Sequence, residues 1–136
     1  MSIKPYAIAY GAAALVFLAL DATWLSTMAS RLYRPLLGPL MLERPDLAAA
    51  VPFYLLYVLG VVVFCIAPAL DTGEWLAAWW RGAFFGLVAY ATYDLTNQAT
   101  LQGWPWRLTL TDMAWGTLAT SVAAAAGAWV ALRWGR

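Results

Sequence analysis

The sequence predicts an all-α integral membrane protein in which four transmembrane helices form one compact bundle. The chain has 136 residues, of which 64% are hydrophobic and only 11% are charged, and its mean hydropathy is +0.70. This composition leaves too little polar surface for a soluble domain. Because one span needs about 20 apolar residues, the chain has room for about four spans and short connections. We therefore expect a single domain.

The expected spans are apolar runs separated by polar or proline-rich connections. The first follows Lys4, and we expect it to be retained rather than cleaved, since Asp21 and Trp24 follow its apolar stretch directly. The next stretch, SRLYRPLLGPLMLERPD, holds three prolines and alternating basic and apolar residues, which predicts an irregular or short-helical segment at the membrane interface. The four spans are expected at about residues 5–29, 47–70, 75–100 and 108–132.

Charge and cysteine content exclude several classes of function. The net charge is only +1 and the basic residues are scattered, so the chain lacks the basic patch that nucleic-acid binding requires. It contains no histidine, and its one cysteine, Cys65, lies in an apolar stretch and has no partner for an intrachain disulfide. Haem and iron–sulfur sites with the usual protein ligands are therefore excluded. We expect no cofactor and no resident metal ion.

Three aspartates, Asp21, Asp94 and Asp112, lie inside the predicted spans. A charged side chain in the bilayer centre costs about 2.5 to 3.5 kcal/mol on insertion scales, so three of them need compensation. Counted from the same membrane side, they lie about eight, six and four residues from the ends of their helices, which places them within roughly 6 Å of depth. The spacing predicts one buried polar site below one membrane surface.

Two of these aspartates begin the same short pattern, Asp-x-x-Trp, in the first and fourth spans. The pattern pairs Asp21 with Trp24 and Asp112 with Trp115. In antiparallel helices the aspartate of one lies at the depth of the tryptophan of the other. We therefore expect each indole N–H to donate a hydrogen bond to the carboxylate on the other helix.

The third span is unusually polar around its aspartate. Tyr90, Asp94 and Asn97 recur at helical spacing on one face. Facing the interior, this face would surround Asp94 with donors and acceptors, whereas facing lipid it would be costly. The alternative interpretation of the site is a hydrogen-bonded brace between helices. Three arginines toward the same membrane side are expected to pair with the aspartates: Arg31, Arg34 and Arg107.

Several of these segments carry a family resemblance. The segments LDATWL, FYLLYVLG with the later PAL, YATYDLTNQATLQGWPW and TDMAWGT resemble the signature blocks of a bacterial predicted membrane protein family, domain of unknown function 2177. The resemblance covers nearly the whole chain and implies a small four-helix membrane protein. It implies no established reaction, ligand or catalytic residue.

Three functions therefore stay open from the sequence. The first is binding or transport of a proton or a small cationic or polar ligand at the aspartates, with Trp24 and Trp115 as cation–π walls. The second is an enzyme acting on a lipid or isoprenoid substrate, in which one carboxylate serves as acid or base. The third is an accessory subunit of a larger membrane complex. The expected partners are membrane lipid, a small cationic or lipid-like ligand, and a second copy or a larger complex, but no nucleic acid.

The expected location is the bacterial inner membrane. The basic residues divide evenly between the two membrane sides, so the positive-inside rule does not choose an orientation by itself. The positive charge of the amino terminus tips the balance, and we expect both termini in the cytoplasm.

Overall fold

Four long helical segments make up most of the chain. The structure, a computed structural model, describes residues 2–135. In chain order the elements are α1 (Lys4–Met28), η1 (Ala29–Tyr33), α2 (Arg34–Leu37), η2 (Gly38–Leu40), α3 (Leu47–Val61), η3 (Val62–Ile66), α4 (Ala67–Thr72), α5 (Trp75–Thr100) and α6 (Trp106–Trp134).

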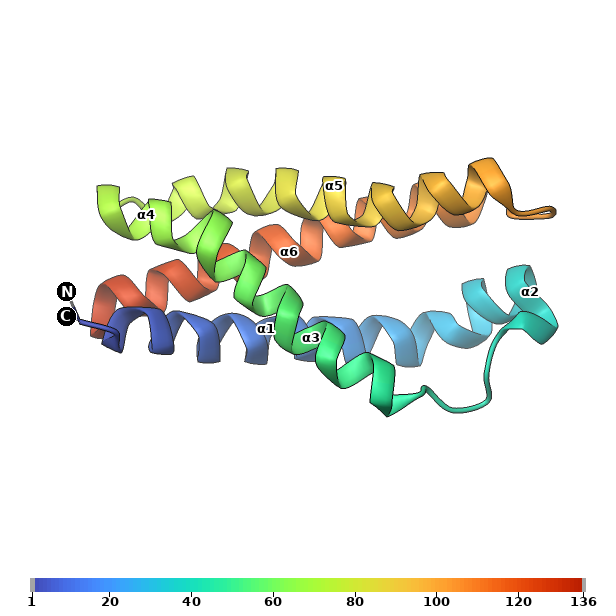
Figure 1. Cartoon of the computed structure of the whole chain (residues 1–136), viewed down its shortest axis with the longest axis horizontal. Coiled ribbons are helices and arrows are strands. Elements are labelled where there is room, and N and C mark those ends of the chain that lie inside the picture. The colour runs from blue at the N-terminus through green and yellow to red at the C-terminus, as the bar shows by residue number, and fades with distance from the viewer. Residues whose placement is uncertain (1, 136) are drawn as a thin grey trace.

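Helix α6 is the centre of the bundle. It packs against α5 along its length and also against α1, while α3 crosses in front of the other helices on a diagonal (Figure 1). The diagonal brings η3 and α4 against α5, but the first half of α3 runs away from α5 toward α1. The helices α3 and α5 therefore diverge at one end of the molecule.

Three helical segments are by themselves long and apolar enough to cross a membrane: Lys4–Leu40, Leu47–Thr72 and Trp106–Trp134. The fourth, α5, has 26 residues, but the polar stretch YATYDLTNQAT lowers its hydropathy. It lies beside α6 (Figure 1) and therefore extends through the same thickness. The prediction of an all-α membrane protein with four long helices is confirmed.

The first connection is short-helical over most of its length, which is one of the two forms predicted for it. Helical structure continues from Lys4 through η1, α2 and η2 to Leu40, and only residues 41–46 are irregular. The prolines in this stretch start new helical turns rather than end the helix, because a missing N–H costs least in the first turn of a segment. Pro35, for example, lies at the start of α2.

Both π-helical segments end directly before a proline-containing turn. In η1 the main chain of Arg34 donates to the carbonyl of Ala29, and in η3 that of Ala67 donates to Val62. The prolines that follow have no N–H for the usual bond to the residue four positions earlier. In the wider turn, the residue before each proline donates instead to the carbonyl five positions earlier. The segment η1 thereby rotates Tyr33 toward the bundle.

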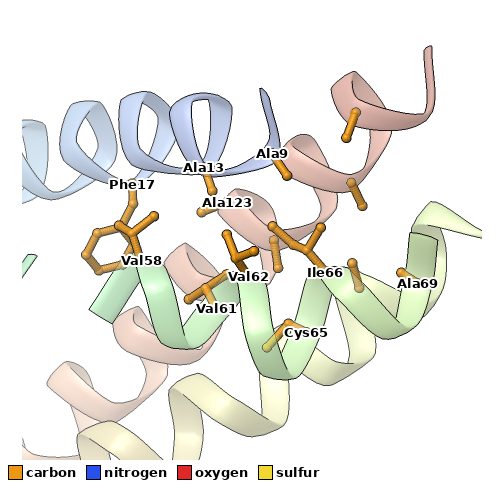
Figure 2. Packing of buried hydrophobic residues seen from close by; sticks show 14 of the residues in the cluster. Ala9, Ala13, Phe17, Val58, Val61, Val62, Cys65, Ile66, Ala69 and Ala123 are labelled. Carbon is orange, nitrogen blue, oxygen red and sulfur yellow. The ribbon is translucent and has the colours of Figure 1, made fainter. Parts of the chain in front are cut away.

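Small residues allow α5 and α6 to approach closely. A Cβ atom on Gly86 would lie 2.5 Å from the carbonyl oxygen of Gly116, and one on Gly82 would lie 2.8 Å from the Cβ of Ala124. On the other side of α6, Gly127 meets the main chain of α1 at Ala9. The buried core continues from α1 through η3 to α6, as Figure 2 shows.

The start of α3 provides one test of local stability. The Asp46 carboxylate accepts a hydrogen bond of 3.0 Å from the main-chain N–H of Ala48. We expect Asp46→Ala to lower the free energy of unfolding by about 1 kcal/mol, because this helix-end donor loses its partner. Unfolding in mixed detergent micelles would measure the change. Asp46→Asn keeps an acceptor and is the control, so an equal loss in both variants would contradict the capping role.

Candidate functional site

A cavity of about 420 Å³ lies within the bundle at the end where α3 and α5 diverge. Every long helix contributes to it: α1, α3, α5 and α6, together with η1. Its polar and aromatic lining residues are Asp21, Tyr33, Phe53, Tyr57, Tyr90, Tyr93, Asp112 and Trp115.

The mouth of this cavity faces sideways. Phe53 on α3 and Tyr93 on α5 both line the cavity, and their side chains are 48% and 55% exposed. These helices diverge toward one end of the molecule (Figure 1). Because the sides of a membrane bundle face lipid, an opening between these two exposed rings faces the bilayer.

The first carboxylate of the cavity is held by a tyrosine from α3. Asp21 on α1 is buried, with 8% of its surface exposed. The hydroxyl of Tyr54 donates a hydrogen bond to its Oδ2 atom. This contact compensates part of the cost of burying a carboxylate.

The second carboxylate is held by a tyrosine from η1. Asp112 on α6 is 7% exposed, and its Oδ1 atom accepts a hydrogen bond of 2.6 Å from the hydroxyl of Tyr33. The same hydroxyl accepts a bond of 2.8 Å from the indole Nε1 of Trp24. A chain of hydrogen bonds therefore runs from Trp24 through Tyr33 to Asp112.

The expected direct pairs between tryptophans and aspartates are wrong. Trp24 and Trp115 do meet at one depth, but their rings stack on each other with centroids 4.4 Å apart and planes 6° apart. Stacking turns the indole edges away from the carboxylates. Trp24 reaches Asp112 only through Tyr33, and the buried Nε1 of Trp115 has no hydrogen-bond partner among the described residues.

Asp94 lies on the seam between α5 and α6 and not in the cavity lining. Tyr90 faces Gly116 across this seam, so one helical turn farther along the antiparallel pair Asp94 faces Asp112. Asp94 is 0% exposed, and within residues 2–135 neither of its oxygens receives a hydrogen bond. The expected shell of donors around Asp94 is therefore wrong.

Neighbouring polar groups satisfy one another rather than Asp94. The Oγ1 atom of Thr109 donates to Gln98 at 2.8 Å, and Gln98 donates to the carbonyl of Trp104 at 2.6 Å. Asn97 is half-buried and is not part of this network. Across the described part of the chain, no three acidic, cysteine or histidine side chains are grouped closely enough to hold a metal ion.

The three arginines predicted to pair with the aspartates lie on the surface. Among residues 2–135, the donors to the side chains of Asp21 and Asp112 are tyrosines. A guanidinium that pairs with a carboxylate inside the bilayer loses its contact with water. This costs more free energy than keeping the guanidinium at the interface. The exposed residues are Arg31, Arg34 and Arg107.

Of the tyrosines at the cavity, only Tyr90 was predicted from the sequence as part of the site. Five of the seven tyrosines of the chain line the cavity or bond to its carboxylates. The signal was present in the pattern FYLLY of α3, where Tyr54 and Tyr57 lie three residues apart on one helix face. Tyr33 has no such signal, because its direction depends on the π turn of η1.

The unpaired position of Asp94 leads to a prediction on stability. We expect Asp94→Asn to unfold at or above the wild-type temperature, because a neutral amide next to Asp112 costs less to bury and donates a hydrogen bond. The thermal midpoint of the purified protein in detergent would test this. Asp71→Asn, the same change at an exposed position, is the control. A midpoint clearly lower in Asp94→Asn alone would show that the carboxyl itself stabilises the bundle.

Comparison with known proteins places this site within a family. A family model described as Predicted membrane protein (DUF2177) matches residues 6–129. The chain belongs to this family. The match includes every residue of the cavity lining, so the site of this DUF2177 protein lies inside the family region. No curated protein and no solved structure is significantly similar to it.

Proposed function

We propose that this membrane protein binds an organic cation in its lateral cavity. The observation that carries the proposal is the composition of the lining, which joins two buried carboxylates to a wall of aromatic rings. No lysine or arginine is among the lining residues of the described chain. A site of this kind attracts positive charge and offers nothing to balance an anion.

The aromatic rings suit a cation that has lost its water. The rings of Tyr57, Tyr90 and Trp115 line the cavity together with Asp21 and Asp112. A cation over an aromatic face gains about 0.5 to 2 kcal/mol, with the larger values where water is excluded. Quaternary ammonium and phosphonium ions lose little hydration and hydrogen-bond to nothing, so they match such walls better than a metal ion does.

The proposal extends to the location of the protein. We place it in the bacterial inner membrane with both termini in the cytoplasm. The two ends of the described chain support the shared side, because Gly135 packs directly against Pro5. The carboxylate cavity then lies nearer the opposite, outer surface. Transport of the cation across the membrane would require the cavity to open to both sides, whereas binding alone requires only the lateral mouth.

Binding of tetraphenylphosphonium to the protein in lipid nanodiscs tests the proposal. A selective electrode would measure the free cation, with empty nanodiscs as the background. The matched probe is tetraphenylborate, which has nearly the same shape and the opposite charge. We expect saturable binding of the cation and none of the anion above background. Equal retention of both ions would show that apolar partition, and not the carboxylates, holds them.

Removing one carboxylate gives the first variant to compare. We expect Asp21→Asn to weaken binding of tetraphenylphosphonium about tenfold or more, since a charge–charge attraction in a buried site is worth a few kcal/mol. The asparagine keeps an oxygen for the hydroxyl of Tyr54, so the fold should persist. Asp71→Asn is the matched control at the exposed end of α4. Equal affinity in the two variants would refute a role for Asp21.

A further inference from the structure

The carboxylate cavity continues into an apolar groove along α3 and α5. A second hollow of about 430 Å³ shares Phe53, Tyr57 and Ala89 with the cavity. Beyond it, a third hollow of about 370 Å³ shares Phe64 and Phe85 with the second. The three hollows share walls and so follow one another from the carboxylates along α3 and α5. We call the part beyond the cavity the α3–α5 groove.

The walls of the α3–α5 groove are apolar over its length. Leu59 and Val63 project from one side, with 50% and 51% of their surfaces exposed, and the ring of Phe85 forms the floor. Gly60 gives this ring its space, because a Cβ there would lie 2.9 Å from the ring of Phe85. The groove ends beside Arg81 on α5. Its only other polar end is the carboxylate cavity.

We propose that the ligand of this protein is an amphiphile, with a cationic head in the cavity and a single hydrocarbon chain in the α3–α5 groove. The inference rests on the proposed function for the head. The position of the hydrocarbon chain follows from the arrangement of the hollows. A ligand seated at Asp21 and Asp112 meets the groove at Tyr57, which lines both hollows. A small water-soluble cation would fill the cavity and leave this path unused.

The polarity of the path fixes the orientation of the amphiphile. Both carboxylates lie at one end, and the hollow between Phe53 and Phe64 offers no charged side chain to a cationic head. The head therefore lies at the carboxylates and the chain points toward Arg81. Because lipid is as apolar as the groove, the chain gains little affinity there. The groove therefore determines where the hydrocarbon chain lies. The position of that chain, and not the affinity, is the quantity that tests the inference.

Photo-crosslinking measures this position. The probe is dodecyltrimethylammonium with a diazirine in the middle of its chain, added to the protein in lipid nanodiscs and activated by light. We expect mass spectrometry to find the label mainly on the groove residues that surround Phe64 and Phe85. Tetraphenylphosphonium, which occupies the head site, should remove this label. Label at Leu118, an exposed residue of α6 outside the three hollows, should be weak and unaffected.

A variant of the groove tests binding of the hydrocarbon chain separately from binding of the cationic head. Val63→Trp fills the groove without touching the cavity lining, so we expect it to lower the groove label severalfold and to leave tetraphenylphosphonium binding unchanged. Leu118→Trp is the matched control and should change neither. Label spread equally over Leu118 and the groove, with no effect of the competitor, would overturn the inference. Absence of tetraphenylphosphonium binding itself would instead refute the proposed function.

Discussion

Gly86→Leu is expected to prevent α5 and α6 from packing and to lower the free energy of unfolding by about 3 kcal/mol or more. The position has no room for any side chain. A Cβ would lie 2.5 Å from the Gly116 carbonyl oxygen and 2.8 Å from the Oγ1 atom of Thr120. The first is main chain, so relief requires the helices to separate. Separation would also move Asp94 away from Asp112 and widen the cavity.

Size-exclusion chromatography after heating in detergent would measure the loss of folded protein. Gly11→Leu is the matched control, because Gly11 is exposed and a Cβ there meets nothing within 4 Å. The same leucine in a helix should leave the midpoint of Gly11→Leu close to wild type. Equal midpoints for the two variants would mean that the seam between α5 and α6 is not as tight as the structure shows.

The double change Asp21→Asn and Asp112→Asn is expected to abolish binding of tetraphenylphosphonium, with an affinity loss of at least about 100-fold. Removing one partner of a buried charge pair costs about 2 to 5 kcal/mol, and the cavity would lose both of its lining charges. The aromatic walls alone contribute at most a few kcal/mol, which ordinary membrane partition would hide.

The fold should survive this double change, because each asparagine keeps an oxygen for Tyr54 or Tyr33. Equilibrium binding in nanodiscs and the thermal midpoint in detergent would be measured on the same preparation. The double change Asp71→Asn and Glu74→Gln removes two exposed carboxylates from the opposite end and is the control. Retained binding in the cavity variant, at an unchanged midpoint, would leave the aromatic walls as the only site and refute attraction by charge.

Much of the fold could be predicted from composition and apolar runs, because a bilayer leaves helices few alternatives. The ends of the spans were harder to predict from the sequence. Helical structure continues to Leu40, where the prolines allowed either an irregular or a short-helical segment. A proline breaks the hydrogen-bond pattern of a helix but not its path when a π turn precedes it, and the choice between these outcomes depends on packing.

The candidate site could be predicted in part. Helix arithmetic identified Asp21 and Asp112, which now line one cavity. It also predicted that Asp94 has the same depth, but depth does not give the direction of a side chain. The stacking of Trp24 on Trp115 could not be derived from spacing, since it depends on how closely α1 and α6 approach.

The lateral opening between Phe53 and Tyr93 determines which ligand concentration sets the occupancy of the cavity. A site that faces the bilayer equilibrates with the concentration of ligand dissolved in lipid, not with the concentration in water. Amphiphilic cations accumulate in membranes, so a site of modest intrinsic strength would be well occupied at a low total amount of ligand. Apparent affinity would then fall as lipid is added at constant ligand, because extra bilayer dilutes the pool from which the site draws.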